Sequence, residues 1–474
     1  MLIMDSSEGD GVENLLGLSI EDMAGLNYKC SCGIYHKVDI HTIKMGHGVL
    51  NELPILLKEF ENKRLFMIED QNTYKVAGKR VEHLLQEDFQ ISKFMFREEH
   101  LVPNEMALGR LLVEIPEDTS LILGIGSGTI NDMARFLSYK LHIPYVIVGT
   151  APSMDGYASV VSPLIVDGVK TTFEAVYPLA IVADLDIMKA APMSMIQAGL
   201  GDILGKYTAL ADWHLAQVLK EEYFCESVEK LVRTAVKKCE LAAERLPFRE
   251  NETIESLTEA LILSGLAIGM VGVSRPASGE EHHLSHCWEM MLMNSGKTTE
   301  WLHGNNVGVG VGIIAEAYRY LRNIDLVKVF ESGKYLNLDI EKWMGNLTKV
   351  YGESAPTIIQ AKKGSISFDQ PQRKSNMEKI MANWNEIKKI CELYVPEPDS
   401  IRDTLKKAGA IYTPKQLGLD REVFRESFIA AKDVRKRYGV LQLLEDLGML
   451  EEAASHVAGI YYSELASLDD SVGQ

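Results

Sequence analysis

The chain has 474 residues, of which 46% are hydrophobic and 24% charged, and its formal net charge at pH 7 is −18. This length allows two or three domains with buried cores. The acidic balance argues against nucleic acid or an anionic membrane as a partner. The N-terminus lacks the basic region of a signal peptide, and no apolar run reaches membrane-spanning length. Six cysteines are too few for a disulfide framework in a chain of this size, so a cytoplasmic protein with reduced thiols is expected.

After a short acidic lead of about 25 residues, Cys30, Cys32 and His36 have the spacing C-x-C-x-x-x-H. No fourth ligand stands nearby in the sequence, and the segment lies among strand-like residues. A surface turn is therefore the favoured interpretation, and a minor metal site is the alternative.

From about residue 38, strand-like apolar runs alternate with helical patterns. The runs at 64–68, 93–96, 121–123 and 145–148 read as strands, and 76–85 and 104–115 as amphipathic helices. Strands that alternate with helices of this length predict a parallel, doubly wound, Rossmann-like sheet.

From about residue 186 the pattern is almost entirely helical, with apolar faces of period 3.6 over 188–215, 227–246, 254–271 and 279–293. We therefore expect an α/β nucleotide-binding domain over 1–185, followed by an all-α domain over 186–474. The cleft between two such domains is the default place for chemistry.

A glycine-rich loop, Gly124-Ile125-Gly126-Ser127-Gly128, lies between the third strand and a helix. Glycines let backbone N–H groups approach a phosphate, and the start of the helix adds favourable partial charge. A tight turn without a ligand is the alternative. The pattern is not the Rossmann fingerprint, because its third glycine is missing and the best acid, Asp70, precedes the loop.

Two further segments carry isolated acids. Residues 150–159 follow the next strand and contain Asp155, either as a ligand-binding residue or as part of a local turn. Asp202 lies in the segment Gly199-Leu200-Gly201-Asp202-Ile203-Leu204-Gly205-Lys206. Each glycine inside a helix costs about 1 kcal/mol relative to alanine, so three together favour a site where backbone or ligand comes close. The alternative is a surface ion pair between Asp202 and Lys206.

Three of the 12 histidines lie within five positions, at His282, His283 and His286, and His303 follows. Ser278 and Glu281 fit a capping box, which predicts a helix that begins there. His282 and His286 then lie on one face, one turn apart, and His283 points away. With Asp202 they suit a catalytic site for a divalent ion such as Zn²⁺, Ni²⁺ or Fe²⁺. Arg275 could meet a phosphate at the start of this helix or form a structural ion pair.

The motifs G-S-G-T-I-N-D, T-A-P-S-M-D-G-Y-A-S, G-D-I-L-G-K, S-R-P-A-S-G-x-E-H-x-x-S-H and L-H-G occur in this order. Together they resemble the sn-glycerol-1-phosphate dehydrogenases, and most closely the bacterial AraM-type members. These belong to the superfamily of dehydroquinate synthase, glycerol dehydrogenase and iron-containing alcohol dehydrogenases. The resemblance runs from about residue 28 into the C-terminal helices. It implies an enzyme of phospholipid metabolism that is a cytoplasmic homodimer.

The resemblance also implies a role for particular residues. Asp202, His282 and His303 would hold one divalent metal ion, either Zn or Ni, with Fe as a third choice. Asp155, Asp202 and His286 would face a small phosphorylated substrate, with His286 and Asp202 taking part in catalysis. NAD or NADP would be bound by Asp70, by Gly128, Thr129, Ile130, Asn131 and Asp132, and by Thr150, Ala151, Pro152, Ser153 and Ser159.

The expected reaction is the reversible, NAD(P)H-linked interconversion of dihydroxyacetone phosphate and sn-glycerol 1-phosphate. A glycerol or polyol dehydrogenase of the same superfamily is the first alternative. A dehydroquinate-synthase-like lyase would ordinarily have Glu where Asp202 stands. A non-catalytic metabolite sensor would not need the complete Asp/His/His set.

Overall fold

The computed structural model describes residues 3–4, 15–60, 62–294, 301–364 and 366–464. Contacts divide the chain into two units. Unit 1 comprises Met1–Ile203 and Cys225–Pro276, and unit 2 comprises Leu204–Phe224 and Ala277–Gln474. The chain therefore leaves unit 1, returns to it at Cys225 and leaves it again after Pro276.

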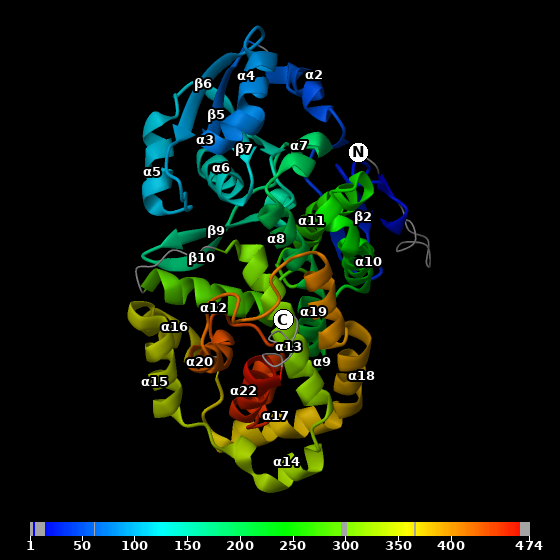
Figure 1. The fold of residues 1–474 in the computed structure, drawn as a ribbon, viewed down its shortest axis with the longest axis vertical. Coiled ribbons are helices and arrows are strands. Elements are labelled where there is room, and N and C mark those ends of the chain that lie inside the picture. The colour runs from blue at the N-terminus through cyan, green and yellow to red at the C-terminus, as the bar shows by residue number, and fades with distance from the viewer. Residues whose placement is uncertain (1–2, 5–14, 61, 295–300, 365, 465–474) are drawn as a thin grey trace, which may run out of the picture. The chain divides into compact units, whose positions relative to one another are not determined.

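Unit 1 is built on a six-stranded parallel sheet in the order β4-β11-β8-β7-β5-β6, which confirms the predicted α/β fold class. Figure 1 labels β5, β6 and β7 of this sheet. The four predicted strands are β5, β6, β7 and β8, and the edge strand β4 and its neighbour β11 complete the sheet. The bounds are β4 (Thr42–Gly46), β5 (Arg64–Asp70), β6 (Gln90–Phe96), β7 (Thr119–Gly126), β8 (Tyr145–Gly149) and β11 (Ala180–Asp184).

Successive side chains of a strand point to opposite faces of the sheet, and here both faces are covered by other segments. One face packs against the segment 49–60 and helix α4 (Lys79–Leu85) through a core that includes Leu65, Met67, Leu121, Leu123, Val146 and Val148. On the other face, α6 (Gly128–Leu141) packs against β7, and a Cβ at Gly124 would lie 3.2 Å from Ala134 Cβ. A parallel sheet covered on both faces explains why its strands read as continuous apolar runs.

Unit 1 also contains helices other than α6. They are α2 (Leu53–Leu56), α3 (Gln71–Thr73), α4 (Lys79–Leu85), α5 (Glu105–Glu114), α7 (Leu185–Ala190), α8 (Met193–Leu204), α10 (Glu226–Ala242) and α11 (Asn251–Val271). An antiparallel hairpin, β9 (Val161–Val166) with β10 (Val169–Glu174), contacts α6. The prediction that no segment is long and apolar enough to cross a membrane was wrong for α11, although 78% of its apolar window is buried, as in the core helix of a globular protein.

A small three-stranded sheet, β1 (Ile3–Met4), β2 (Asn27–Lys29) and β3 (Tyr35–Lys37), precedes the large one. The turn between β2 and β3 carries the cysteine and histidine segment. The prediction of a surface turn is wrong for two of its residues, because Cys30 and His36 are 5% and 0% exposed. Their burial comes from contacts with residues far along the chain, which the local sequence does not reveal.

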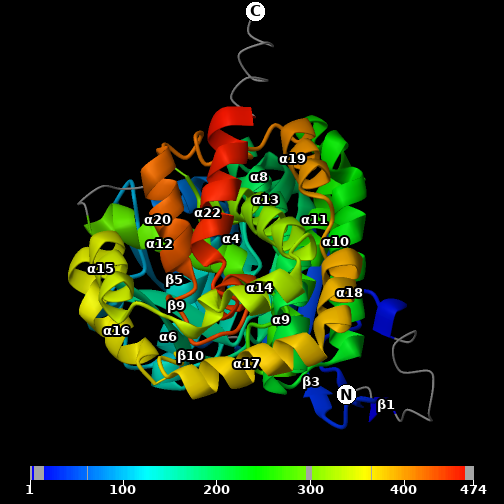
Figure 2. The ribbon, with the colours of Figure 1, turned by 90° about the horizontal axis from the view of Figure 1, so that it is seen from below.

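Unit 2 is helical in the part that the structure describes. Helix α13 is its centre: nearly every residue from Gly304 to Tyr318 is buried, and α9, α12, α18, α19, α21 and α22 all contact it. Figure 2 shows α20 and α22 side by side. The bounds are α9 (Lys206–Lys220), α12 (Glu280–Asn294), α13 (His303–Arg322), α14 (Leu326–Ser332), α15 (Ile340–Tyr351), α16 (Ala355–Lys362), α17 (Gln370–Ala382), α18 (Trp384–Tyr394), α19 (Pro398–Lys407), α20 (Arg421–Ala431), α21 (Val440–Asp446) and α22 (Leu450–Gly459).

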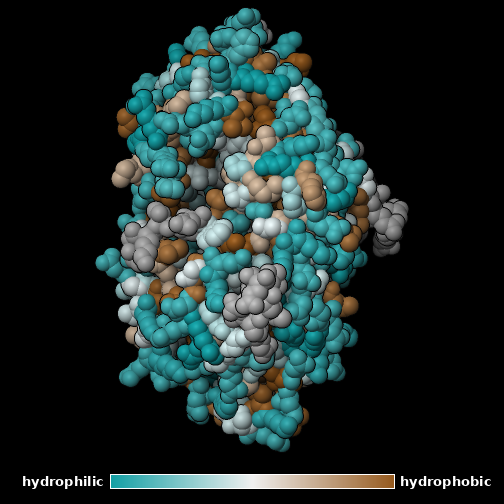
Figure 3. Space-filling model, in the orientation of Figure 1, coloured by the Kyte–Doolittle hydropathy of each residue, from teal (hydrophilic) through white to brown (hydrophobic). Residues whose placement is uncertain are grey.

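The division by contacts differs from a single boundary at residue 185. Helices α8, α10 and α11 were expected in the helical domain but belong to the unit of the sheet, apart from Leu204 at the end of α8. Of the helices that precede α12, only α9 lies wholly in unit 2. Helical periodicity shows that a face is buried, but not which neighbour buries it. The face of the molecule in Figure 3 is mostly hydrophilic, with apolar residues in small groups, in keeping with the charged composition.

Candidate active site

The predicted nucleotide-binding segments meet at one edge of the large sheet. β5, β7 and β8 are consecutive neighbours, and their carboxyl ends lead to Asp70, to Gly126–Gly128 and to Thr150. Ligands of open parallel sheets bind outside the carboxyl ends of the strands. The fold thus brings together segments that are up to 80 positions apart in the chain.

The glycine loop turns β7 directly into α6. β7 ends at Gly126, and α6 begins at Gly128. A Cβ on Gly126 would lie 2.6 Å from the Cβ of Ile130, so glycine allows the helix to start this close to the strand. The amide of Asn131 donates to the Ser127 carbonyl at 3.0 Å, and the amides of Gly128, Thr129 and Ile130 precede this first helical bond. Such amides, with the helix dipole, form an anion-binding position.

Several of the predicted nucleotide-binding residues also make side-chain contacts within the protein. Ile130 lies in the core, and the buried Asn131 donates from Nδ2 to the Gly156 carbonyl at 2.9 Å. Asp132 pairs with Arg135 at 3.1 Å, and burial raises the pKa of Asp132 to about 7 although Arg135 opposes the shift. Asp70 caps α3, with Oδ1 accepting from the amides of Asn72 and Thr73 at 2.8 Å.

The loop after β8 is tied to the glycine loop. Ser153 Oγ lies 2.5 Å from Ser127 Oγ, and the Thr150 amide donates to the Gly126 carbonyl at 3.2 Å. Ala151 and Pro152 continue the same segment. Ser159 differs, because its hydroxyl accepts from the Val161 amide at 3.1 Å and closes a local turn.

The two predicted acids of unit 1 are neighbours. The Asp155 amide donates to Asp202 Oδ2 at 2.9 Å, and Ser264 Oγ donates to Asp155 Oδ2 at 3.0 Å. A Cβ on Gly199 would lie 1.9 Å from the Pro152 carbonyl oxygen, so this glycine accommodates a close backbone, as predicted. Asp202 and Lys206 are 1% and 0% exposed, which excludes the alternative of a surface pair.

The three predicted histidines of unit 2 form one group. His303, the first residue of α13, lies with its ring centroid 5.3 Å from those of both His282 and His286. The rings of His282 and His286, one turn apart on α12, are 6.3 Å apart. His283 lies outside the group and faces Glu280, with 2.9 Å between Nδ1 and Oε2.

Two carboxylates orient the predicted ligand histidines. Nδ1 of His282 lies 2.7 Å from Glu281 Oε1, and Nδ1 of His303 lies 2.7 Å from Glu289 Oε1. When Nδ1 donates to a carboxylate, the lone pair on Nε2 is left for a metal, which is the usual arrangement at metal-binding histidines. Glu281 and Glu289 were not identified as site residues from the sequence. Glu281 directly precedes His282, which was a usable signal, whereas Glu289 pairs with a histidine of another helix.

The capping box predicted from Ser278 is wrong. Helix α12 begins at Glu280, and its first bonds run to the Gly279 carbonyl. Glu281 Oε1 accepts from the Gly279 amide at 2.6 Å, and among the described residues Ser278 Oγ has no hydrogen-bond partner. Thr208 Oγ1 in α9 donates to Glu281 Oε2 at 2.6 Å, so both oxygens of this carboxylate already accept hydrogen bonds from groups other than Ser278.

Comparison with known proteins identifies a family model that matches part of unit 1 and relatives that share most of their own length with this chain. The family model described as iron-containing alcohol dehydrogenase matches residues 44–192. The glycerol-1-phosphate dehydrogenase (NAD(P)+) of Halalkalibacterium halodurans is 40% identical over 61% of this chain and 74% of its own length. The protein of the same name from Geobacillus thermodenitrificans is 31% identical over 91% of this chain and 99% of its own. A probable glycerol dehydrogenase from Sinorhizobium meliloti 1021 shares the fold, with a TM-score of 0.57 and 15% identity over 89% of this chain and 97% of that one.

Proposed function

Since the chain belongs to the glycerol-1-phosphate dehydrogenase family, we propose that it interconverts dihydroxyacetone phosphate and sn-glycerol 1-phosphate with NAD(P)H and one divalent metal ion. The observation that carries the proposal is the group of His282, His286 and His303, in which two of the rings are oriented by buried or partly buried carboxylates. Metal-binding histidines usually donate Nδ1–H to such a partner, and here the two oriented rings also lie next to each other.

Asp202, His282 and His303 are the proposed metal ligands. Two imidazoles and one carboxylate suit zinc, nickel or iron as the resident ion. When bound, the ion supplies Lewis-acid polarisation of the substrate carbonyl. Asp202 keeps one oxygen on the Asp155 amide, and this bond orients the carboxylate in α8.

The nucleotide is proposed to lie at the carboxyl edge of the sheet. The amides at the start of α6 would hold its pyrophosphate, and the Asp70 carboxylate would accept from a ribose hydroxyl. Thr150, Ala151, Pro152, Ser153 and Ser159 would line the same edge. Nicotinamide supplies the hydride, and the protein orients it against the substrate.

Reduction of a ketone takes up one proton at the carbonyl oxygen, and His286 is the proposed donor. Its ring stacks on that of His303 with an interplanar angle of 26°, one helical turn from His282. We assign His286 the role of a titratable group beside the metal ligands rather than that of a ligand. Asp155 would hold a substrate hydroxyl. We also propose that the protein is a cytoplasmic homodimer.

The division of labour between His282 and His286 is testable by two substitutions. His282→Ala should lose the bound metal and turnover together. His286→Ala should keep the metal and lose about 10²–10⁴ in kcat, the usual contribution of a positioned general acid. Metal content by mass spectrometry and NADH oxidation with dihydroxyacetone phosphate measure the two effects. His283→Ala, outside the group on the same helix, is the control that should retain the metal.

Equal loss of metal from the His282 and His286 variants would refute the assignment. Replacing dihydroxyacetone phosphate by dihydroxyacetone tests the substrate class. A polyol dehydrogenase would prefer the unphosphorylated ketone. A lyase would release phosphate from a heptulosonate substrate without net NADH consumption.

A further inference from the structure

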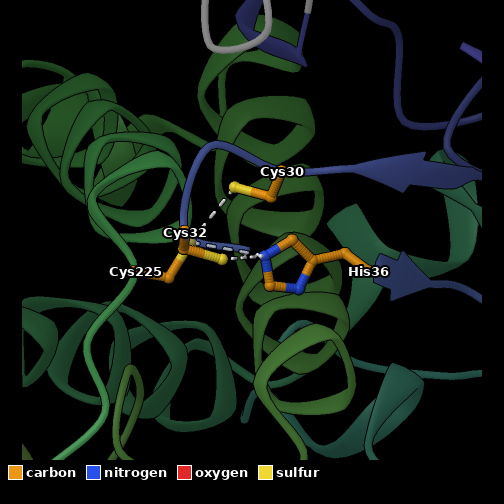
Figure 4. A group of neighbouring side chains, drawn as sticks. All are labelled: Cys30, Cys32, His36 and Cys225. Carbon is orange, nitrogen blue, oxygen red and sulfur yellow. Dashed lines mark hydrogen bonds between the residues drawn. The ribbon is translucent and has the colours of Figure 1, made fainter. Parts of the chain in front are cut away.

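Three cysteines and a histidine that the proposed reaction does not use gather in unit 1. Cys30, Cys32, His36 and Cys225 each offer one ligand atom, and these atoms all lie within 4.8 Å of one another. Figure 4 shows their side chains converging, with dashed contacts among them. Cys225 adds a fourth potential ligand, which the C-x-C-x-x-x-H segment lacks in its own neighbourhood.

The backbone places three of the four on one hairpin. The Gly33 amide donates to the Cys30 carbonyl, and the Cys30 amide donates to the Ile34 carbonyl, both at 3.0 Å. Gly33 has φ +88°, a conformation that favours glycine and closes this turn. His36 then lies on the returning strand β3. Cys225, the residue before α10, reaches the hairpin from 195 positions along the chain.

Three of the six distances between the four ligand atoms match those of a tetrahedral metal site, and all six are within 4.8 Å. Zinc with sulfur ligands at about 2.3 Å and nitrogen at about 2.0 Å places two sulfurs about 3.8 Å apart and a sulfur and a nitrogen about 3.5 Å apart. The sulfurs of Cys30 and Cys225 are 3.7 Å apart. His36 Nε2 lies 3.4 Å from the sulfur of Cys32 and 3.3 Å from that of Cys225.

The ring of His36 is also oriented as a metal ligand requires. Its Nδ1 lies 2.7 Å from the Met270 carbonyl oxygen in α11. A carbonyl can only accept, so Nδ1 carries the hydrogen and the lone pair is on Nε2, which faces the sulfurs. The backbone of α11 thereby sets the tautomer.

A disulfide bond does not explain why these four residues lie together. The Cys30 and Cys225 sulfurs are well beyond the bond length of about 2.05 Å, and all six cysteines are free. A cysteine pair would also leave the other two members of the group unexplained. Three thiolates with one imidazole are a donor set that selects zinc.

We propose that Cys30, Cys32, His36 and Cys225 bind one structural Zn²⁺ ion, which shares no ligand with the proposed catalytic metal. Four protein ligands leave no open position, so this ion does not react with substrate. It joins the β2–β3 hairpin to the start of α10, where the chain re-enters unit 1. A cross-link that closes a long stretch of chain removes more conformational entropy from the unfolded state than one that closes a short stretch.

Cobalt substitution tests the site independently of activity. Protein freed of metal under reducing conditions and reloaded with Co²⁺ should show near-ultraviolet sulfur-to-cobalt charge transfer, which ligands of Asp and His alone cannot produce. Wild type as isolated should hold one zinc per chain that a thiol-reactive mercurial releases. Cys225→Ser should lose that zinc and the charge-transfer absorption. The matched control is Cys239→Ser, another buried cysteine of the same unit, whose thiol faces the Ser256 carbonyl and which should keep both.

Absence of the charge-transfer absorption in reduced, cobalt-loaded wild type would overturn the proposal, even if Cys225→Ser does not fold. So would zinc retained in full by Cys225→Ser. The His282→Ala variant separates the two metals, since it should lose turnover and keep the sulfur–cobalt absorption. An active enzyme with no thiolate-bound metal would refute this site and leave the proposed function intact.

Discussion

Two adjacent glutamates on the first turn of α12 each face a histidine ring, but their charge states differ. Burial raises the pKa of Glu280 to about 8. Glu281 is also buried, yet hydrogen bonds from His282, Thr208 and the Gly279 amide outweigh burial and keep the pKa of Glu281 below its usual value. Glu281 is therefore the anionic member of the pair at neutral pH, and it is the one that orients a proposed metal ligand.

We predict that Glu281→Gln weakens metal binding by about 10- to 100-fold, the effect typical of removing a carboxylate that holds a ligand histidine. Titration of the metal-free protein with zinc or nickel measures it. Glu280→Gln is the matched control, because Glu280 faces His283, which lies outside the histidine group. Equal weakening in both variants would show a general effect on the helix rather than control of His282.

At the scale of secondary-structure elements, packing requires glycine at position 126, in the turn from β7 to α6. The Cβ of an alanine at 126 would overlap Ile130, whose side chain belongs to the first turn of α6. The helix start would have to move away from the strand. The same amides would then no longer point where the proposed pyrophosphate lies.

Gly126→Ala is accordingly expected to weaken NADH binding at least tenfold, which corresponds to about 1.4 kcal/mol, and to destabilise unit 1 by about 1–3 kcal/mol. Fluorescence titration and denaturant unfolding check these values. Gly109→Ala is the control, because a Cβ at this position in α5 meets nothing within 4 Å. This substitution should raise the free energy of unfolding by at most about 1 kcal/mol, through the higher helix propensity of alanine. Unchanged NADH affinity in Gly126→Ala would argue against nucleotide binding at this turn.

At the scale of the whole molecule, each unit contains a long apolar helix that is mostly buried. In α11 the residues from Ile254 to Ile268 are mostly buried, and in α13 those from Gly304 to Tyr318. Helix α5, in contrast, exposes Met106 and Val113 by 74% and 83%. Amides of buried central elements exchange only when much of the structure opens, whereas those of exposed elements exchange through local opening.

Hydrogen exchange should therefore be slowest in peptides from α11 and α13 and markedly faster in α5. Mass spectrometry of a labelling time course measures the order. Exchange in α13 as fast as in α5 would contradict the description of α13 as the centre of unit 2.

The sequence by itself determined the local features of this protein. Continuous apolar runs predicted β5, β7 and β8, and helical periodicity predicted α10, α11 and α12, because each pattern reports the burial of a face. The four-residue spacing of His282 and His286 likewise follows from helix geometry. The order of the motifs was enough to indicate the family.

Only the tertiary structure decided which distant segments meet. It placed β4 and β11 in the sheet, assigned α10 and α11 to unit 1, supplied Glu289 to His303, and brought Cys225 to the hairpin of Cys30 and His36. Periodicity states that a residue is buried but does not name its partner, because the partner is set by how elements pack and not by their spacing in the chain.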